Sequence, residues 1–174
     1  MEYRVLERDE LDKFMEIDRS EVIEHIYYYR DGRLELEEEF YDMKGFPPGE
    51  QEALLQRQYK IYDAGGTVIG CFNKGKLVGI TSVENKLRGK TRNYIKMDVL
   101  FVSSSFRGHG VAKRLVELAC EAARNFGGTK LYISATPSEN TVNFYFSLGS
   151  RVAEEIDEEL LKLEPEDIHL ELPL

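Results

Sequence analysis

The feature that most constrains the fold is a strand–helix–strand pattern in the second half of the sequence. Residues 94–102 have the composition of a strand, and the apolar Leu-Phe-Val at its end indicates cover on both faces. An amphipathic run from Gly110 to Phe126 predicts a helix, and residues 131–135 predict another strand. Strands joined through a helix run parallel, because the crossover returns the chain to the same end of the sheet. The sequence therefore predicts a right-handed parallel crossover over residues 94–135.

Other segments predict strands and helices around this crossover. Asp31-Gly32 is a preferred tight-turn pair between two β-prone runs, which predicts a hairpin near residues 22–41. No internal repeat or linker is present, so we expect one α+β domain over residues 1–174. The remaining expected elements are a strand at 2–6, a helix capped by Asp9, a helix at 50–64, a hairpin of strands 67–72 and 77–84, a polar loop at 85–93, a helix from a capping box at 136–139 to 148, and a closing hairpin of 151–156 with 168–172.

Charge and composition exclude several function classes. The formal net charge of −9 argues against nucleic acid as a partner, because such proteins need a basic surface. No window approaches the roughly 18 apolar residues of a membrane span, and the N-terminus lacks the apolar core of a secretory signal. We therefore expect a cytoplasmic protein with no membrane partner. Cys71 and Cys120 are too few for a disulfide framework and lack metal-ligand spacing, so no metal is expected.

The loop between the predicted strand and helix has the features of a phosphate site. Backbone N–H groups at a helix start are unpaired and lie in the positive end of the helix dipole. Gly108 and Gly110 allow close approach to that backbone, and Arg107, Lys113 and Arg114 add positive charge. The segment is therefore suited to bind an anionic phosphate group.

Two common nucleotide motifs do not fit this loop. A dinucleotide fingerprint would need a glycine where Lys113 stands, and an acidic residue at the end of the next strand, where the chain has Ala135 and Thr136. The Gly-Lys-Ser/Thr ending of a P-loop is also absent.

Two paired motifs resemble those of the GNAT superfamily of N-acetyltransferases. Arg107-x-x-Gly110-x-Ala112 resembles the acetyl-CoA signature Gln/Arg-x-x-Gly-x-Gly/Ala, which in that family also follows the fourth strand and opens a helix. Asn140-x-x-x-Phe144-Tyr145-x-x-x-Gly149 resembles the family's later Asn…Phe-Tyr-x-x-x-Gly-Phe helix. The resemblance covers about residues 67–149. It implies a mixed, mostly antiparallel sheet flanked by helices, acetyl-CoA as co-substrate, and a bulged fourth strand that splays from the fifth.

The resemblance also implies site residues. The cofactor-binding residues are expected to be Leu100, Phe101, Val102, Arg107, Gly108, His109, Gly110, Val111, Ala112, Lys113, Asn140 and Tyr145. Backbone N–H groups from Arg107 to Lys113 would hold the pyrophosphate. Backbone groups of Leu100 and Val102 would pair with the acetyl carbonyl and the pantetheine arm. Tyr145 would be the general acid for the departing thiolate, because its ordinary pKa of about 10 suits proton sharing with a thiol near about 8.5.

The sequence departs from the family in several places. Many members have a glutamate where this chain has Lys96, so a glutamate base on that strand is absent. Asp98 is the nearest acidic candidate for the base, and Glu84 is another. Asn140 is two residues closer to the Phe-Tyr pair than is usual, and Ser150 replaces the usual aromatic. No histidine has a partner that indicates catalysis.

The hairpin near residues 22–41 has no place in the minimal family pattern and is interpreted as an insertion. We expect Leu34, Leu36 and Phe40 on one of its faces and the intervening glutamates on the other. The tyrosines at 27–29 could pack within the fold, contact a second subunit, or wall the acceptor site. Family members often form dimers, so a homodimer is an expectation.

The sequence thus predicts an N-acetyltransferase that moves acetyl from acetyl-CoA directly to a primary amine of a small molecule or peptide. Its acidic surface favours a cationic acceptor. Two alternatives stay open at this point: a GNAT-fold module that binds acyl-CoA without turnover, and an interaction protein whose inserted hairpin binds a partner.

Overall fold

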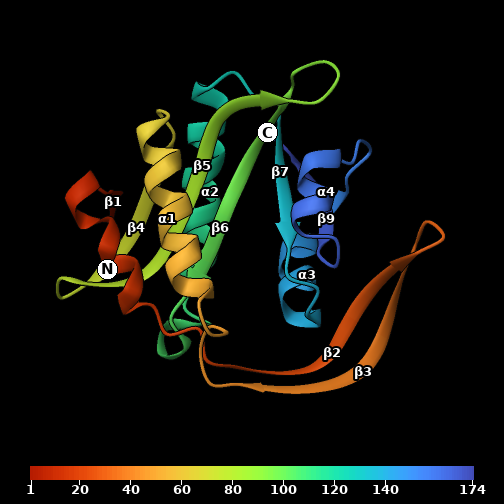
Figure 1. The fold of residues 1–174 in the computed structure, drawn as a ribbon, viewed down its shortest axis with the longest axis horizontal. Coiled ribbons are helices and arrows are strands. Elements are labelled where there is room, and N and C mark those ends of the chain that lie inside the picture. The colour runs from red at the N-terminus through yellow and green to blue at the C-terminus, as the bar shows by residue number, and fades with distance from the viewer.

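The computed structural model describes all 174 residues and contains one large sheet and one separate hairpin (Figure 1). The strand order of the seven-stranded sheet is β1-β4-β5-β6-β7-β9-β8, and β2 pairs only with β3. The strands are β1 (Glu2–Val5), β2 (Glu21–Arg30), β3 (Arg33–Met43), β4 (Thr67–Asn73), β5 (Lys76–Arg88), β6 (Tyr94–Val102), β7 (Lys130–Ala135), β8 (Arg151–Val152) and β9 (Ile168–Pro173). The helices are α1 (Glu50–Asp63), α2 (Val111–Asn125), α3 (Glu139–Ser147) and α4 (Glu158–Leu163), with 3₁₀ segments η1 (Arg8–Glu16) and η2 (Ser104–Phe106).

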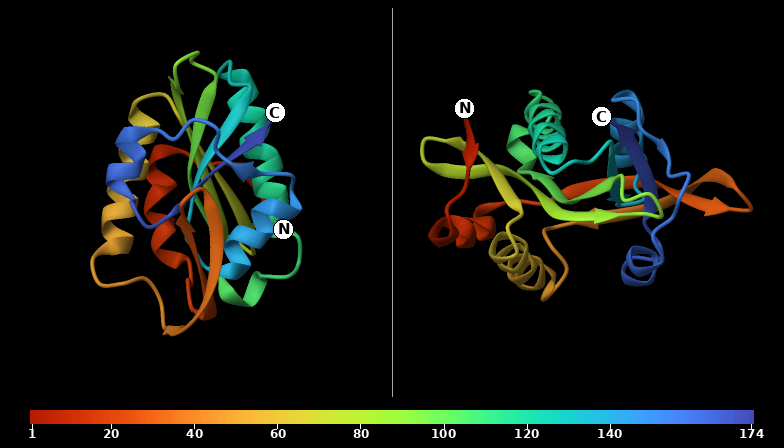
Figure 2. Two further views of the ribbon diagram at one scale, coloured as in Figure 1. Left: turned by 90° about the vertical axis from the view of Figure 1, so that its right-hand side faces the viewer. Right: turned by 90° about the horizontal axis from the view of Figure 1, so that it is seen from above.

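The predicted crossover is present as β6–α2–β7. Strands β6 and β7 pair in parallel, and every other pair of neighbouring strands is antiparallel. The sheet is therefore mixed and mostly antiparallel, as expected. Helices α2 and α3 lie on one face of the sheet, and η1, α1 and α4 lie on the other (Figure 2).

Two main apolar clusters, one on each face, hold the helices to the sheet. The larger cluster joins β6, β7 and β9 to α2 and α3 through fully buried side chains such as Leu131, Val142 and Leu170. On the opposite face, Leu11 and Phe14 of η1 pack against Val68, Leu77 and other residues of β4 and β5. Burial of this apolar surface from water is the main stabilising contribution to the layered arrangement.

The centre of the sheet opens where β6 and β7 stop pairing. Their register runs only from Tyr94–Lys130 to Met97–Ile133, so the last five residues of β6 have no partner on β7. The pairing of β6 with β5 shifts by one residue between Met97 and Leu100, which indicates a β-bulge there. The Thr81 hydroxyl donates to the Val99 carbonyl within the bulge, at 2.7 Å. The bulge and the splay that the resemblance implied are thus both present.

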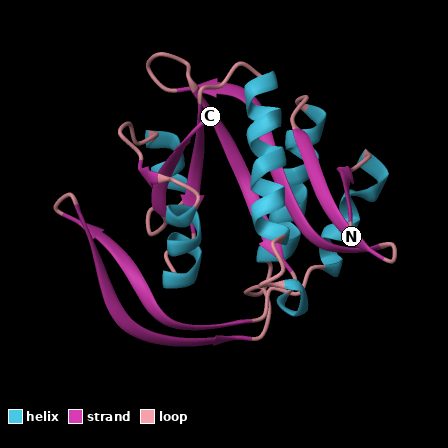
Figure 3. Cartoon of the chain, turned by 180° about the vertical axis from the view of Figure 1, so that it is seen from behind, coloured by secondary structure: helices cyan, strands magenta, loops and turns pink.

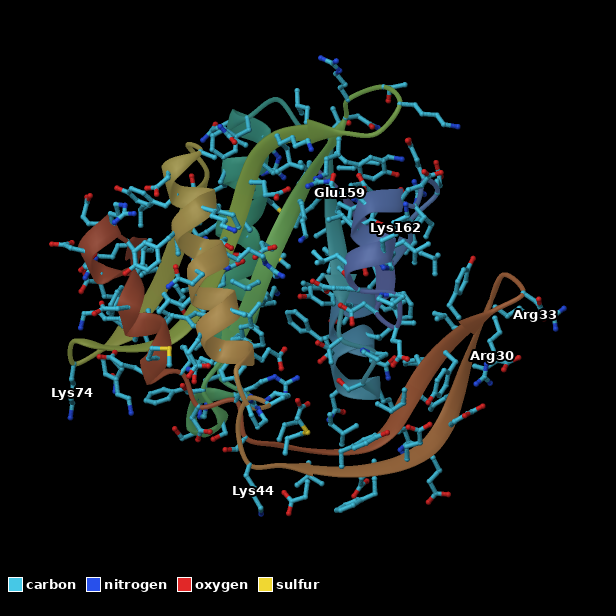
Figure 4. The ribbon with its side chains drawn as sticks, in the orientation of Figure 1. Arg30, Arg33, Lys44, Lys74, Glu159 and Lys162 are labelled. Carbon is cyan, nitrogen blue, oxygen red and sulfur yellow. The ribbon has the colours of Figure 1, made fainter.

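The hairpin is confirmed, but its predicted apolar face is wrong. Strands β2 and β3 form a long arm that extends away from the sheet (Figures 1 and 3), with the turn at Asp31-Gly32. The register slips by one residue on β3 between Glu38 and Tyr41. This bulge ends the alternation, so Phe40 does not follow Leu34 and is 69% exposed. Arg30 and Arg33 lie at the far tip of the arm (Figure 4).

Three other expectations are corrected by long-range contacts. Strand β5 extends into the expected polar loop at 85–93 as far as Arg88, because that guanidinium is buried against Glu84 and Asp157. The first helix is a 3₁₀ segment in which the Glu7 N–H bonds to the Glu10 carboxylate, so Asp9 is not its cap. Helix α3 begins at Glu139 without the capping box.

The reason for the later start of α3 lies in the hairpin. The Tyr27 N–H donates to the Pro137 carbonyl at 2.7 Å, and Ile26 bridges to Ser138. Residues 137 and 138 are therefore held as an extended edge of β2. The Ser138 hydroxyl donates to Thr141 Oγ1 at 2.9 Å, and its side chain makes no capping hydrogen bond to the helix backbone.

Candidate active site

A cleft of about 740 Å³ occupies the splay between β6 and β7. Its lining runs from Arg107 and the first turn of α2 to the α4–β9 loop, with α1 and α3 contributing side walls. The walls bring together most of the predicted cofactor residues, including Leu100, Arg107, Ala112, Asn140 and Tyr145. Separated strands leave backbone groups without ladder partners, which makes them available to a ligand.

The predicted phosphate loop has open space around its backbone. Gly108 and Gly110 adopt φ values of +79° and +82°, a left-handed conformation that favours glycine. A Cβ atom at either position would meet no atom within 4 Å, so a ligand can approach both. Gly110 precedes α2, whose first-turn N–H groups at Val111, Ala112 and Lys113 are available for an anion.

The Arg107 side chain positions this loop through backbone contacts. Its Nε donates to the Val102 carbonyl at 2.9 Å and its Nη1 to the Ser20 carbonyl at 2.7 Å. The segment is also fixed to Asp18, which accepts hydrogen bonds from the Ser104 and Ser20 hydroxyls. These bonds lower the pKa of Asp18 to about 2. The sequence suggested a free positive charge at Arg107, whereas the structure gives its guanidinium a role in fixing the loop. The His109 ring points back to the Phe106 carbonyl at 3.4 Å.

The end of β6 forms one wall of the cleft. Leu100, Phe101 and Val102 all line it. The ring of Phe101 also packs on Phe14 and Phe46, with centroid separations of 6.1 and 5.1 Å, which anchors the free end of the strand. An aromatic anchor of this kind keeps the end of β6, which pairs with β5 but has no partner on its β7 side, in place beside the cleft.

Tyr145 lies on the opposite wall, on α3. Its side chain is 5% exposed, and its hydroxyl makes no hydrogen bond although it lines the cleft. Burial raises the pKa of Tyr145, and the nearby charge of Asp167 adds to this shift. The phenol is therefore a protonated, unpartnered donor beside the cleft. Asn140, in the first turn of the same helix, also lines the cleft.

Asp98 lies in the bulge of β6 and is enclosed by cations. It accepts hydrogen bonds from Lys96 Nζ at 2.7 Å, Arg57 Nε at 2.8 Å and Gln58 Nε2 at 2.9 Å. Burial alone would raise the pKa of the Asp98 carboxyl, but Lys96 and Arg57 outweigh it and hold that pKa below its usual range. A carboxylate held in this way is a poor proton acceptor, which disfavours the expected role of Asp98 as the base.

A second acidic group in the cleft was missed by sequence reasoning. Glu164 and Asp167, here called the carboxyl pair, lie at the end of α4 and in the loop before β9, and both line the cleft. Ser134 Oγ, near the end of β7, lies 3.0 Å from Glu164 Oε2 and 3.1 Å from Asp167 Oδ2. The only sequence signal was two acidic residues three apart beside a short helix, a spacing that is common on solvated surfaces.

The structure contains no group of three or more His, Cys, Asp or Glu side chains that could hold a metal ion. None of its helices has the length and apolar character needed to cross a bilayer. Both cysteines are buried and free, and neither lines the cleft.

Comparison with known proteins identifies the family. The sequence profile of the acetyltransferase (GNAT) family matches residues 30–149, which is more than half of the chain. The chain belongs to the GNAT acetyltransferase family. This match confirms the predicted family, the acetyltransferase class and acetyl-CoA as the co-substrate. A sequence comparison with curated proteins finds no significant match.

Solved GNAT structures share the fold over nearly the whole chain. A Bacillus anthracis protein named as a streptothricin acetyltransferase, crystallised with acetyl coenzyme A, superposes with a TM-score of 0.72 at 18% identity. The match covers 99% of this chain and 98% of that one. Nourseothricin acetyltransferase gives 0.70 at 18% identity, covering 99% and 97%. Aminoglycoside 6'-acetyltransferase type Ii gives 0.62 at 13% identity, also covering 99% and 97%. These likenesses confirm the predicted fold class.

Proposed function

We propose that this GNAT protein transfers the acetyl group of acetyl-CoA directly to a primary amine in the cleft between β6 and β7. One observation carries the proposal: Arg107 and Ala112, which flank the open loop at the start of α2, line the same cleft as the unpartnered Tyr145 phenol and the end of β6. The loop suits the phosphates of the donor, and the phenol suits its departing sulfur.

The backbone of β6 would bind the reacting part of the donor. The first-turn N–H groups of α2 hold the pyrophosphate, and backbone groups of Leu100 and Val102 pair with the acetyl carbonyl and the pantetheine arm. A fixed N–H at the carbonyl stabilises the oxyanion that forms when the amine attacks, by about 3–4 kcal/mol. No side chain is needed for this step.

Tyr145 would complete the transfer. When the C–S bond breaks, the thiolate takes the phenolic proton, and the phenolate recovers a proton from the newly bonded nitrogen. The raised pKa of Tyr145 keeps the phenol protonated but makes it a weaker acid toward the thiolate, so the proton from the nitrogen reaches the phenol oxygen as the thiolate takes the phenolic proton. Direct transfer is favoured over an acyl-enzyme because neither Cys71 nor Cys120 lines the cleft.

The proposed acceptor is a cationic amine. Acidic side chains, among them Glu50 of α1, Glu166 and the carboxyl pair, outnumber basic ones in the cleft lining, and of the basic ones Arg57 is already paired with Asp98. Several solved relatives are named for cationic antibiotics, such as nourseothricin and the aminoglycosides, which supports this class of acceptor.

We also propose a single domain over residues 1–174, a cytoplasmic location and a homodimer.

Calorimetry with acetyl-CoA tests the donor site. We expect micromolar binding of acetyl-CoA and free CoA by the purified protein and no comparable binding of NADH. Arg107→Glu should abolish it, because the change breaks the bonds to the Val102 and Ser20 carbonyls and places a negative charge at the phosphate loop.

Turnover is then followed as thiol release with spermidine, kanamycin and nourseothricin as acceptors. Release that depends on an amine supports the transferase. Binding of acetyl-CoA without release in any case would favour the non-catalytic module instead.

A further inference from the structure

We propose that the carboxyl pair, Glu164 and Asp167, is the site that binds the ammonium group of the acceptor and removes the proton that blocks its attack. This inference rests on the proposed function and adds the group that recognises and deprotonates the substrate. It assigns to two residues of the α4–β9 segment the role expected from Asp98.

The geometry of Ser134 indicates that the carboxyl pair holds one proton. The Ser134 oxygen lies within hydrogen-bond distance of both carboxyl groups, at 3.0 and 3.1 Å. A hydroxyl has one proton and can donate to only one of them, so a proton on the other carboxyl completes the arrangement. Burial and the charge of Glu164 raise the pKa of Asp167 well above its usual range, which places that proton on Asp167.

Neighbouring charges keep the other member of the pair ionised. Arg57 Nη1 lies 3.5 Å from Glu164 Oε1, and Arg57 also bonds to Asp98, which in turn bonds to Lys96. Although burial acts in the opposite direction, the Asp167 hydrogen bond together with Lys96 and Arg57 lowers the pKa of Glu164. Positive and negative side chains thus alternate from Lys96 and Asp98 on β6 through Arg57 on α1 to Glu164. Asp98 helps to keep Glu164 ionised because it holds Arg57 in place.

An independent observation directs this site toward a ligand. The Tyr145 side chain is 5% exposed, its hydroxyl has no partner in the protein, and Asp167 in its ionised state is close enough to raise the pKa of Tyr145. The hydroxyl oxygen is not among the fully buried unpaired polar atoms, so it is open to the cleft, where a bound molecule can be its hydrogen-bond partner. An amine between Tyr145 and the carboxyl pair would be next to the thioester that Tyr145 serves.

The proton balance is consistent with net acetyl transfer. When an ammonium binds, the carboxyl pair releases its shared proton to solvent and carries two negative charges against the cation. One ammonium proton then moves to the pair, and the neutral amine forms the C–N bond with the acetyl carbon. The C–S bond breaks, the thiolate takes the Tyr145 proton, and the nitrogen returns a proton to Tyr145. The products are the amide, CoA thiol and one proton in solution.

The acceptor amine needs a proton acceptor. With an ordinary pKa of about 10.4 it is neutral in only about one molecule in 2,500 at pH 7, so a group that removes its proton has a large effect on the rate. The charged or titratable groups that face the pair from neighbouring elements are Lys96 and Asp98 of β6, Arg57 and Glu50 of α1, Tyr145 of α3, Glu166 of its own loop, and His169 of β9, whose Nε2 lies 3.1 Å from the Glu164 carbonyl.

The test compares the pair variants Glu164→Gln and Asp167→Asn with a control, Glu158→Gln. Glu158 is an exposed residue of α4 that forms no ion pair, so the control also removes one negative charge. Spermidine, kanamycin and nourseothricin are titrated by calorimetry at pH 7, with and without CoA, in two buffers of different ionisation enthalpy. The wild-type protein should release roughly one proton per bound amine. Asp167→Asn should release none, and both pair variants should lose about 10²-fold or more in kcat/KM for the amine. Acetyl-CoA affinity should stay unchanged in all three variants.

The outcomes separate this inference from the proposed function. Amine binding by the wild-type protein without proton release overturns the inference without using any variant. The inference is also overturned if the pair variants match Glu158→Gln in amine affinity and kcat/KM. It is overturned as well if the wild-type protein binds acetyl-CoA but binds none of the three amines. If the wild-type protein does not bind acetyl-CoA, the proposed donor site is refuted instead. The amine titrations without CoA still test the carboxyl pair in that case.

Discussion

Replacing Asp98 by asparagine distinguishes a structural carboxylate from a catalytic base. Asp98 and Lys96 have side chains that are 1% and 3% exposed, and they pair at 2.7 Å. The substitution keeps the shape of the side chain but leaves the Lys96 ammonium buried without a counter-ion. It also replaces one of the two acceptors of Arg57 with a neutral group.

The expected cost follows from this burial. Removing one partner of a buried ion pair destabilises a protein by about 3–5 kcal/mol, because the remaining charge stays desolvated. For a chain of this size each kcal/mol lowers Tm by about 2–4 °C, so Asp98→Asn should lower Tm by roughly 6–20 °C at pH 7. A double variant, Lys96→Met with Asp98→Asn, should regain part of the loss, since no ammonium is then buried.

The pH dependence has a definite sign. The pKa of Asp98 is lower in the folded state than its ordinary value of 3.8, so its stabilising contribution is complete above that value. It is lost as the pH falls through the folded-state pKa. The difference in Tm between wild type and Asp98→Asn should therefore be constant from pH 7 to about pH 5 and shrink below about pH 4.

Thermal denaturation followed by circular dichroism measures these differences. Asp63→Asn is the control, since it removes an aspartate whose pair with Arg8 is about half exposed and screened by salt. Its Tm should fall much less. Thiol release is measured well below both melting temperatures. A variant with wild-type stability and a kcat lowered by 10²-fold or more would refute this reasoning and restore Asp98 as the base.

Three further predictions concern the donor site and a distant ion network. Tyr145→Phe should lower kcat by about 10²-fold or more and leave acetyl-CoA affinity unchanged. The control Tyr27→Phe, outside the cleft, should leave kcat unchanged. Equal kcat values for the two variants would exclude the Tyr145 phenol as the acid. Gly110→Ala should weaken acetyl-CoA binding in calorimetry, whereas Gly75→Ala, with a similar φ of +80° in a distant turn, should cost stability alone. Hydrogen bonds from four donors outweigh burial and lower the pKa of Glu171 to about 2, so Glu171→Gln should lower Tm at pH 7, by an amount that shrinks as the pH falls from about 4.5 toward 2.

Local signals predicted most of the sheet and the glycine loop before α2 correctly. The turn at Asp31-Gly32, the glycines before α2 and the apolar periodicity of α2 act over a few residues, so they can be seen without the fold. Errors arose where distant segments meet. Arg88 extends β5 because Asp157 receives its guanidinium, and Ser138 loses its capping role because β2 pairs with the segment before α3.

The sequence by itself determined the crossover, the family motifs and the glycine loop before α2, because each depends on residues that are neighbours along the chain. Only the tertiary structure decided which carboxylates face the cleft as potential proton acceptors. Asp98 is neutralised by Lys96 and by Arg57, which is 41 positions away, and Glu164 and Asp167 meet on Ser134, which is at least 30 positions away. The pKa of a carboxyl group depends on burial and on charges within a few ångströms, and these distances exist only after the sheet has closed.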